Sequence, residues 1–192
     1  VSLQYAEREP RFYASIAYNG MYWHLGNEPE VQNQDQQVFY YRGDGNGYAN
    51  SMFWLRTGIG VAKYVHPDDT YYNSDAAKVK DKDEPAIRYA DILLMYAEAS
   101  LEAGDKPTAI EYLDMVRTRG DNMPSIGDTY PQGITENQLR EIIRRDRRIE
   151  LAFEDKRWWD ILRWKICDGE NGVMNKPIGG MKIEDTNGDG VW

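Results

Sequence analysis

Three acidic side chains recur at steps of four residues in the last third of the sequence. Asp146, Glu150 and Glu154 occupy positions i, i+4 and i+8, so a helix would place them on one stripe. A pair of carboxylates can act as acid and base, which is the first chemistry that this spacing suggests. However, like charges stacked on one stripe repel one another unless cations lie between them.

Six arginines nearby supply candidate cations for this stripe. They are Arg144, Arg145, Arg147, Arg148, Arg157 and Arg163. Guanidiniums pair bidentately with carboxylates, so the alternative to acid–base chemistry is a partly buried network of ion pairs that ties the last two helices together. We favour the network, because such networks shift pKa values without catalysing a reaction. In that case Glu154→Ala should destabilise the fold, since it leaves an arginine unpaired.

No other pattern in the sequence indicates an enzyme. The sequence contains neither a G-x-S-x-G nor an H-E-x-x-H motif, and we find no pairing of a nucleophile with a base. We therefore predict a non-catalytic protein.

Residues 185–190 match the first six positions of a calcium-binding EF-hand loop. Asp185, Asn187 and Asp189 would supply the oxygen ligands, but the bidentate glutamate of such a loop would fall beyond the end of the sequence. A surface turn on the Asn-Gly pair is the alternative, and we favour it. Apart from calcium at this loop, we expect no cofactor.

Aromatic residues are frequent among amides and charged residues in the first part of the chain. Tyr22, Trp23, Tyr40 and Trp54 are the candidates for a carbohydrate site, because aromatic faces stack on sugar rings while amides and carboxylates bind hydroxyl groups. The alternative is that they fill the core of a loop-rich region.

Apolar residues at helical spacing predict two helices joined by a short turn. The first stripe is Ile87, Ala90, Leu94, Ala97 and Leu101, and the second is Ala109, Ile110, Leu113 and Val116. Pro85 stands where a first-turn proline belongs and Gly104 ends the first helix, whereas Pro107 begins the second and Gly120 ends it. The pair fits one tetratricopeptide unit of ~34 residues.

A third, longer helix follows. Thr135 and Gln138 form a capping box, and we predict that this helix runs to about Asp155. A shorter helix then carries three tryptophans, Trp158, Trp159 and Trp164. We expect these rings to pack between helices, with a binding surface as the alternative.

For the remainder of the chain, the sequence predicts loops with short strands, and one such strand is expected at residues 61–65. The layout is a single domain with a loop-rich ligand face (1–84), a helical scaffold (85–166) and a turn-rich tail (167–192).

A net charge of −9 argues against nucleic acid and anionic membranes as partners. One cysteine excludes an internal disulfide, and no apolar run reaches the ~18 residues that a membrane-spanning helix needs.

Several segments together resemble the SusD/RagB family. They are residues 87–99 (IRYADILLMYAEA), 112–119 (YLDMVRTR), 145–154 (RDRRIELAFE), the tryptophan-rich 157–164, and, upstream, 10–13 and 57–64. The resemblance covers roughly residues 10–165. Asp146 stands where the family usually has glutamate, a change that still permits an ion pair.

The resemblance implies a mainly α fold: a tetratricopeptide-like hairpin, a long helix and a Trp-rich helix, with a loop-rich region carrying short strands. It implies a surface lipoprotein of the outer membrane that serves nutrient uptake and polysaccharide utilisation. Such a protein binds a glycan or oligosaccharide as partner of a TonB-dependent transporter of the SusC type.

The sequence resembles the carboxy-terminal portion of such a protein, whose signal and lipidated cysteine we expect outside these 192 residues. The alternative function is a tetratricopeptide-like protein-interaction module without a sugar site of its own.

Overall fold

The computed structural model describes residues 3–22, 37–40, 55, 57–66, 69, 80–121, 123–170, 172–177, 179–181 and 183. The chain forms two compact units. The mixed unit comprises Val1–Arg8, Phe12–Asp83 and Pro177–Trp192, and the helical unit comprises Glu9–Arg11 and Glu84–Lys176. That all segments belong to one domain with the layout given above stays a prediction.

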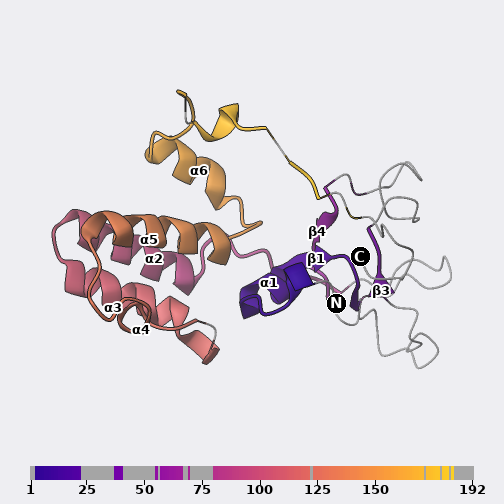
Figure 1. Cartoon of the computed structure of the whole chain (residues 1–192), viewed down its shortest axis with the longest axis horizontal. Helices are drawn as coiled ribbons and strands as arrows, with labels where there is room; N and C mark the ends of the chain where they lie inside the picture. Colours follow the sequence, from indigo (N-terminus) through magenta and orange to yellow (C-terminus); the bar gives the residue numbers. More distant parts are fainter. Residues whose placement is uncertain are drawn as a thin grey trace. The chain divides into compact units, whose positions relative to one another are not determined.

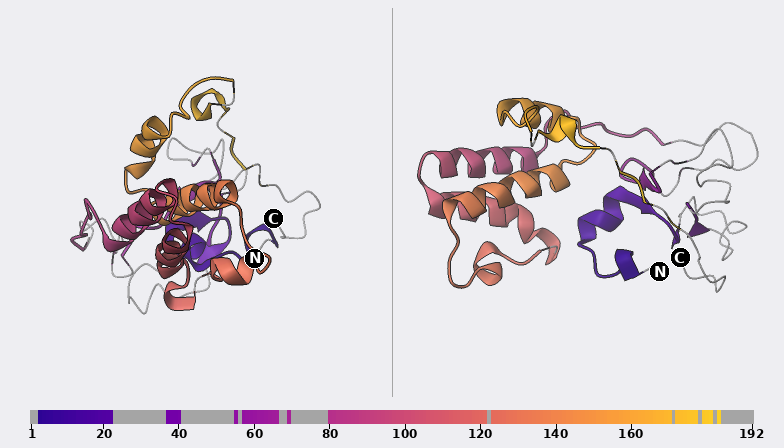
Figure 2. Two further views of the ribbon diagram at one scale, coloured as in Figure 1. Left: turned by 90° about the vertical axis from the view of Figure 1, so that its left-hand side faces the viewer. Right: turned by 45° about the horizontal axis from the view of Figure 1, so that its top comes forward.

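The helical unit is built on an antiparallel hairpin and a long third helix (Figure 1). These are α2 (Tyr89–Glu102), α3 (Lys106–Arg117) and α5 (Glu136–Glu150), which lie side by side in both views of Figure 2. The shorter elements are η2 (Arg119–Asp121), α4 (Ile126–Thr129), α6 (Lys156–Arg163) and η3 (Val173–Asn175). The fold is therefore mainly α, with the predicted hairpin, long helix and tryptophan-bearing helix.

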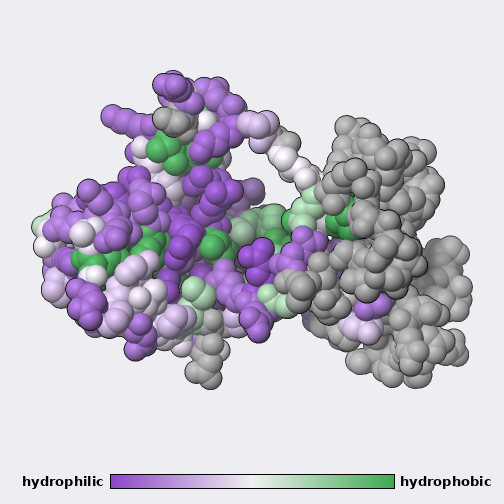
Figure 3. Space-filling view, viewed as in Figure 1, coloured by the Kyte–Doolittle hydropathy of each residue, from purple (hydrophilic) through white to green (hydrophobic). Residues whose placement is uncertain are grey.

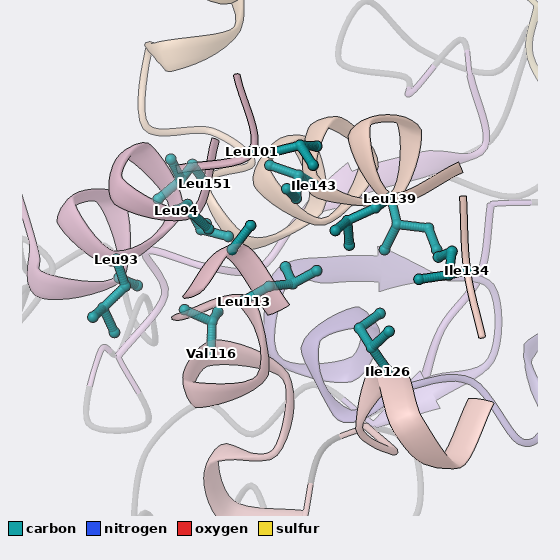
Figure 4. Close-up of a cluster of buried hydrophobic side chains, with 14 residues drawn as sticks. Leu93, Leu94, Leu101, Leu113, Val116, Ile126, Ile134, Leu139, Ile143 and Leu151 are labelled. Atoms are coloured by element: carbon teal, nitrogen blue, oxygen red, sulfur yellow. The ribbon is translucent and has the colours of Figure 1, made fainter. Parts of the chain in front are cut away.

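Apolar side chains between α2, α3 and α5 form the core of this unit (Figure 4). They are Ala90, Leu93, Leu94, Ala97, Leu101, Ala109, Leu113, Val116, Ile126, Ile134, Leu139, Ile142, Ile143 and Leu151. Ala97 and Ala109 are fully buried, and their small size lets α2 and α3 approach closely. The predicted stripes are confirmed at these positions, whereas Ile110 is only partly buried. Each fully buried Leu or Ile contributes about 1.5–3 kcal/mol.

The start of α2 differs from the prediction. Arg88 is its N-cap in an extended conformation (φ −125°), so Pro85 lies outside the first turn and Ile87, before the helix, is 64% exposed. The other end agrees with the sequence, because Gly104 takes a left-handed φ of +85° just after α2. Asp105 then caps α3 by accepting a hydrogen bond from the Thr108 amide.

The capping box predicted for α5 is present, since the side chains and amides of Thr135 and Gln138 bond reciprocally. The helix nevertheless ends at Glu150 rather than near Asp155. Phe153 and Asp155 have left-handed φ angles of 65° and 56°, which a continuous α-helix does not allow.

Two small antiparallel sheets lie in the described part of the mixed unit. In one, β1 (Ile16–Tyr18) pairs with β4 (Ile59–Val61); in the other, β2 (Met21–Tyr22) pairs with β3 (Gln37–Val38). Before them come η1 (Leu3–Tyr5) and α1 (Pro10–Ser15). The strand predicted at 61–65 is wrong in position, because a turn closed by the Val65 amide and the Ala62 carbonyl follows Val61.

Within the described ranges, the longest helices are too short and too polar to cross a lipid bilayer.

Candidate ligand-binding sites

Two of the four aromatic candidates lie on the ribbon of β2 and β3. Tyr22 is 55% exposed and is paired with Gln37 across the ribbon. Tyr40 follows β3, and its amide donates to Asn19 Oδ1 over 2.7 Å. Burial raises the pKa of the Tyr40 phenol, so this hydroxyl stays neutral. Tyr40 is only partly exposed, so Tyr22 is the more accessible of these two rings.

The other candidates fall outside the described residues. Trp23 and Trp54, and the predicted calcium ligands Asp185, Asn187 and Asp189, belong to this group. Their roles stay predictions. Among the residues that the structure describes, no group of three or more His, Cys, Asp or Glu side chains is placed to hold a metal ion.

An aromatic cluster beside β1 was not foreseen from the sequence. The rings of Tyr5 and Tyr18 lie 4.9 Å apart, and those of Phe12 and Tyr18 lie 5.5 Å apart. The Tyr13 hydroxyl donates to the Tyr5 carbonyl over 2.6 Å. The Phe-Tyr pair in α1 was visible as a sequence pattern, but its partners are set by the folding of α1 against β1. The cluster supports β1, which leads directly to the Asn19 turn and the ribbon.

In the helical unit, the carboxylate stripe on α5 is a network of buried ion pairs. Asp146 Oδ2 accepts from Arg117 Nη1 over 2.5 Å. Glu150 Oε1 accepts from Arg88 Nη1 over 2.7 Å and lies 3.2 Å from Arg119 Nη2. The prediction of an ion-pair network is therefore confirmed.

The six arginines named from the sequence have several different partners. Of the six arginines named from the sequence, Arg145 lies near the stripe, at 3.7 Å from Asp146, whereas Arg147 and Arg163 both bind Asp160. The guanidiniums of Arg88, Arg117 and Arg119, which bind the stripe, come from other segments.

The electrostatics of Glu150 argue against a general acid on this stripe. Burial raises the pKa of its carboxyl, but the hydrogen bond and charge of Arg88, with the charges of Arg119 and Arg11, outweigh burial and hold the pKa below its ordinary value. A carboxylate that stays ionised has no proton to donate. Glu150 therefore serves as an ion-pair partner and not as a proton donor.

A second buried network joins α6 to α2 and α5. Arg147 Nε lies 2.9 and 3.0 Å from the two Asp160 oxygens, and its Nη1 lies 2.6 Å from Asp91 Oδ1. All three side chains are buried. The Arg147 guanidinium on α5 thus binds one carboxylate of α2 and one of α6. This confirms that ion pairs tie the last two helices, α5 and α6, together.

Two of the three tryptophans near α6 do not pack between helices as predicted. Trp158 and Trp159 are 49% and 66% exposed, while Ile161 is the apolar side chain that α6 buries. Charged side chains, rather than aromatic ones, hold α6 on the unit. Trp164 is partly buried and donates its indole N–H to Glu98 Oε1 over 2.7 Å. Three guanidiniums lie 4.7–5.9 Å from its ring, those of Arg144, Arg157 and Arg163.

Comparison with known protein families gives one match over nearly the whole chain. The profile of the SusD family matches residues 1–190. Two curated relatives come from Formosa agariphila. SusD-like protein P2 is 39% identical over 100 residues, covering 47% of this chain and 19% of the relative. SusD-like protein P38 is 35% identical over 93 residues, covering 46% and 18%.

Two solved structures from Bacteroides fragilis NCTC 9343 are similar to this fold. A SusD-like protein matches 85% of this chain at 34% identity with a TM-score of 0.64. A SusD-like carbohydrate-binding protein matches 84% at 30% identity with a TM-score of 0.63. The matched part is 29% of each of those chains, so this chain spans well under half the length of its relatives.

Proposed function

Because this chain belongs to the SusD family, we propose that it contributes to non-catalytic binding of an oligosaccharide at the cell surface. The observation that carries the proposal is the family match over residues 1–190. One of the similar solved structures is described as a carbohydrate-binding protein. The ion pairs on α5 add support, because they keep its carboxylates in a structural role.

Tyr22 is the residue through which we propose that the ribbon contacts a sugar. Its ring is more than half exposed, and its cross-strand partner Gln37 offers an amide that both donates and accepts hydrogen bonds. The Gln37 side chain donates to the Gly20 carbonyl over 3.2 Å, which holds it in place. Trp23, Tyr40 and Trp54 complete the proposed aromatic set.

The proposal extends to location and partner. We propose that the protein works as an outer-membrane lipoprotein beside a TonB-dependent transporter of the SusC type, to which it would pass its glycan. The similarity of residues 87–99 and 145–164 to the SusD/RagB segments supports this assignment.

Calorimetric titration with a panel of neutral oligosaccharides tests the sugar site. Tyr22→Ala should weaken binding about tenfold, which corresponds to about 1.4 kcal/mol. Tyr89→Ala is the matched control, because Tyr89 is 68% exposed and lies in the helical unit. Equal affinities of Tyr22→Ala and the unmodified chain would remove Tyr22 from the site. A panel without any binding to folded protein would overturn the function.

A protein-interaction module is the second candidate function. Exposed apolar side chains on α2 favour it, since Tyr89, Ile92 and Tyr96 are 45–68% exposed and follow helical spacing. Capture of a SusC-type transporter by a chain that binds no oligosaccharide would support this function over the first.

A further inference from the structure

A hollow of about 430 Å³ lies between α2 and α6 in the helical unit. This volume falls within the range of small-molecule sites in proteins. Met95 and Ala99 of α2 and Trp159 of α6 form its apolar part. Figure 3 shows apolar (green) surface on the α6 segment at the top of the view.

Trp159 offers an aromatic face to this hollow. Its side chain is 66% exposed, although tryptophan is highly buried on average. The adjacent Trp158 is also exposed, at 49%, but it does not line the hollow. The two neighbouring tryptophans are therefore both exposed, but only Trp159 lines the hollow.

The polar lining consists of matched charges. Arg163 binds Glu98 through both Nη atoms, at 2.7 and 2.6 Å, and Arg140 binds Glu102 at 2.6 and 3.1 Å. Asp160 is likewise paired with Arg147. Since each of these carboxylates has a guanidinium partner, the hollow favours a neutral ligand over a charged one.

These pairs retain hydrogen-bonding capacity toward a ligand. Arg163 uses three of its five N–H groups in the bonds to Glu98 and Asp160. The Glu102 side chain is 50% exposed, and a carboxylate has about four acceptor sites. A ligand with hydroxyl groups, which both donate and accept, fits this edge. A purely apolar ligand would bury the charged groups without replacing their bonds to water.

We propose that the hollow binds one pyranose ring of a neutral oligosaccharide. The C–H face of the ring lies against Trp159, and its hydroxyl groups bond with Glu102 and Arg163. This site extends the proposed function, because it takes the same class of ligand, but it uses none of the residues assigned on the β2–β3 ribbon.

The test is calorimetric titration of Trp159→Ala with the best oligosaccharide of the panel, and Trp158→Ala is the matched control. Trp159→Ala should weaken binding about tenfold, whereas Trp158→Ala should bind as the unmodified chain does. In ¹H–¹⁵N spectra, the indole resonance of Trp159, assigned through the variant, should shift on titration. Thermal melting of both variants verifies folding.

The outcomes separate this site from the ribbon. If Trp159→Ala retains full affinity, or if both tryptophan variants weaken binding equally, the hollow is not the site. Loss of binding in Tyr22→Ala alone would leave the proposed function standing and overturn this inference. Loss in Trp159→Ala alone would support the hollow and remove Tyr22 from the site. A folded, unmodified chain that binds no oligosaccharide would overturn both.

Discussion

Arg117 on α3 donates to Asp146 on α5 over 2.5 Å, with both side chains almost fully buried, at 2% and 1% exposed. Arg117 also donates to the Pro124 carbonyl, so one guanidinium joins α3, α5 and the segment between them. Removing one member of a buried pair leaves an unpaired charge in the interior. This contact therefore tests how far the ion-pair networks stabilise the helical unit.

Asp146→Leu should lower the free energy of unfolding by about 3–5 kcal/mol, because it leaves the Arg117 guanidinium unpaired. The double variant with Arg117→Met should recover much of this loss, since neither charge remains buried. Urea denaturation of the single and double variants measures both effects. Strictly additive losses would show that the two side chains do not act as a pair.

Arg147→Met should have an effect of similar size, about 3–5 kcal/mol, because both Asp91 and Asp160 lose a buried partner. Arg148→Met is the control; the exposed neighbour on the same helix should change stability by less than about 0.5 kcal/mol. Hydrogen exchange should show faster amide exchange in α6 of Arg147→Met. Unchanged exchange in α6 would mean that other contacts hold this helix.

Arg88 Nε donates to both carboxylate oxygens of Glu154, over 3.0 and 2.8 Å. Glu154→Ala should therefore cost about 1–3 kcal/mol, the range for leaving a buried polar group unsatisfied. The loss is smaller than for Arg147→Met, because Arg88 keeps its bonds to the Glu150 carboxylate and carbonyl. Thermal melting measures it, with Glu141→Ala on an exposed site as control. Equal melting temperatures for the two variants would contradict the expectation.

Asp69 should make the mixed unit sensitive to acid. The hydrogen bond from Lys82 lowers the pKa of its carboxyl to about 2, against the effect of burial and with help from the amides of Lys80 and His66. Because this pKa lies below the ordinary 3.8, ionised Asp69 stabilises the fold above that value. The contribution is lost as the pH falls through about 2.

Carboxyl ¹³C shifts of the folded chain, followed between pH 5 and pH 2, measure this pKa. Asp69→Asn should remove the corresponding part of the acid dependence of stability. A titration midpoint of Asp69 near its ordinary value would show that Lys82 does not bind it in solution.

Local patterns in the sequence were sufficient to predict most of the helical framework. The α2–α3 hairpin, its Gly104 turn and the capping box of α5 depend on residues only three or four positions apart, and each was confirmed. The start of α2 and the end of α5 were less predictable. Each involves Arg88, which caps α2 and also donates to the Glu150 carbonyl from 62 positions away.

The candidate sites show the same division between local and long-range information. The sequence by itself determined the family, the mainly α fold, the stripe of carboxylates and the need for arginines near it. Only the tertiary structure decided which arginines pair with the stripe, that Trp158 and Trp159 face solvent, and that Trp159 borders a hollow. The physical reason is that spacing along a helix sets which face a residue lies on, whereas the partner of that face comes from segments distant in the chain.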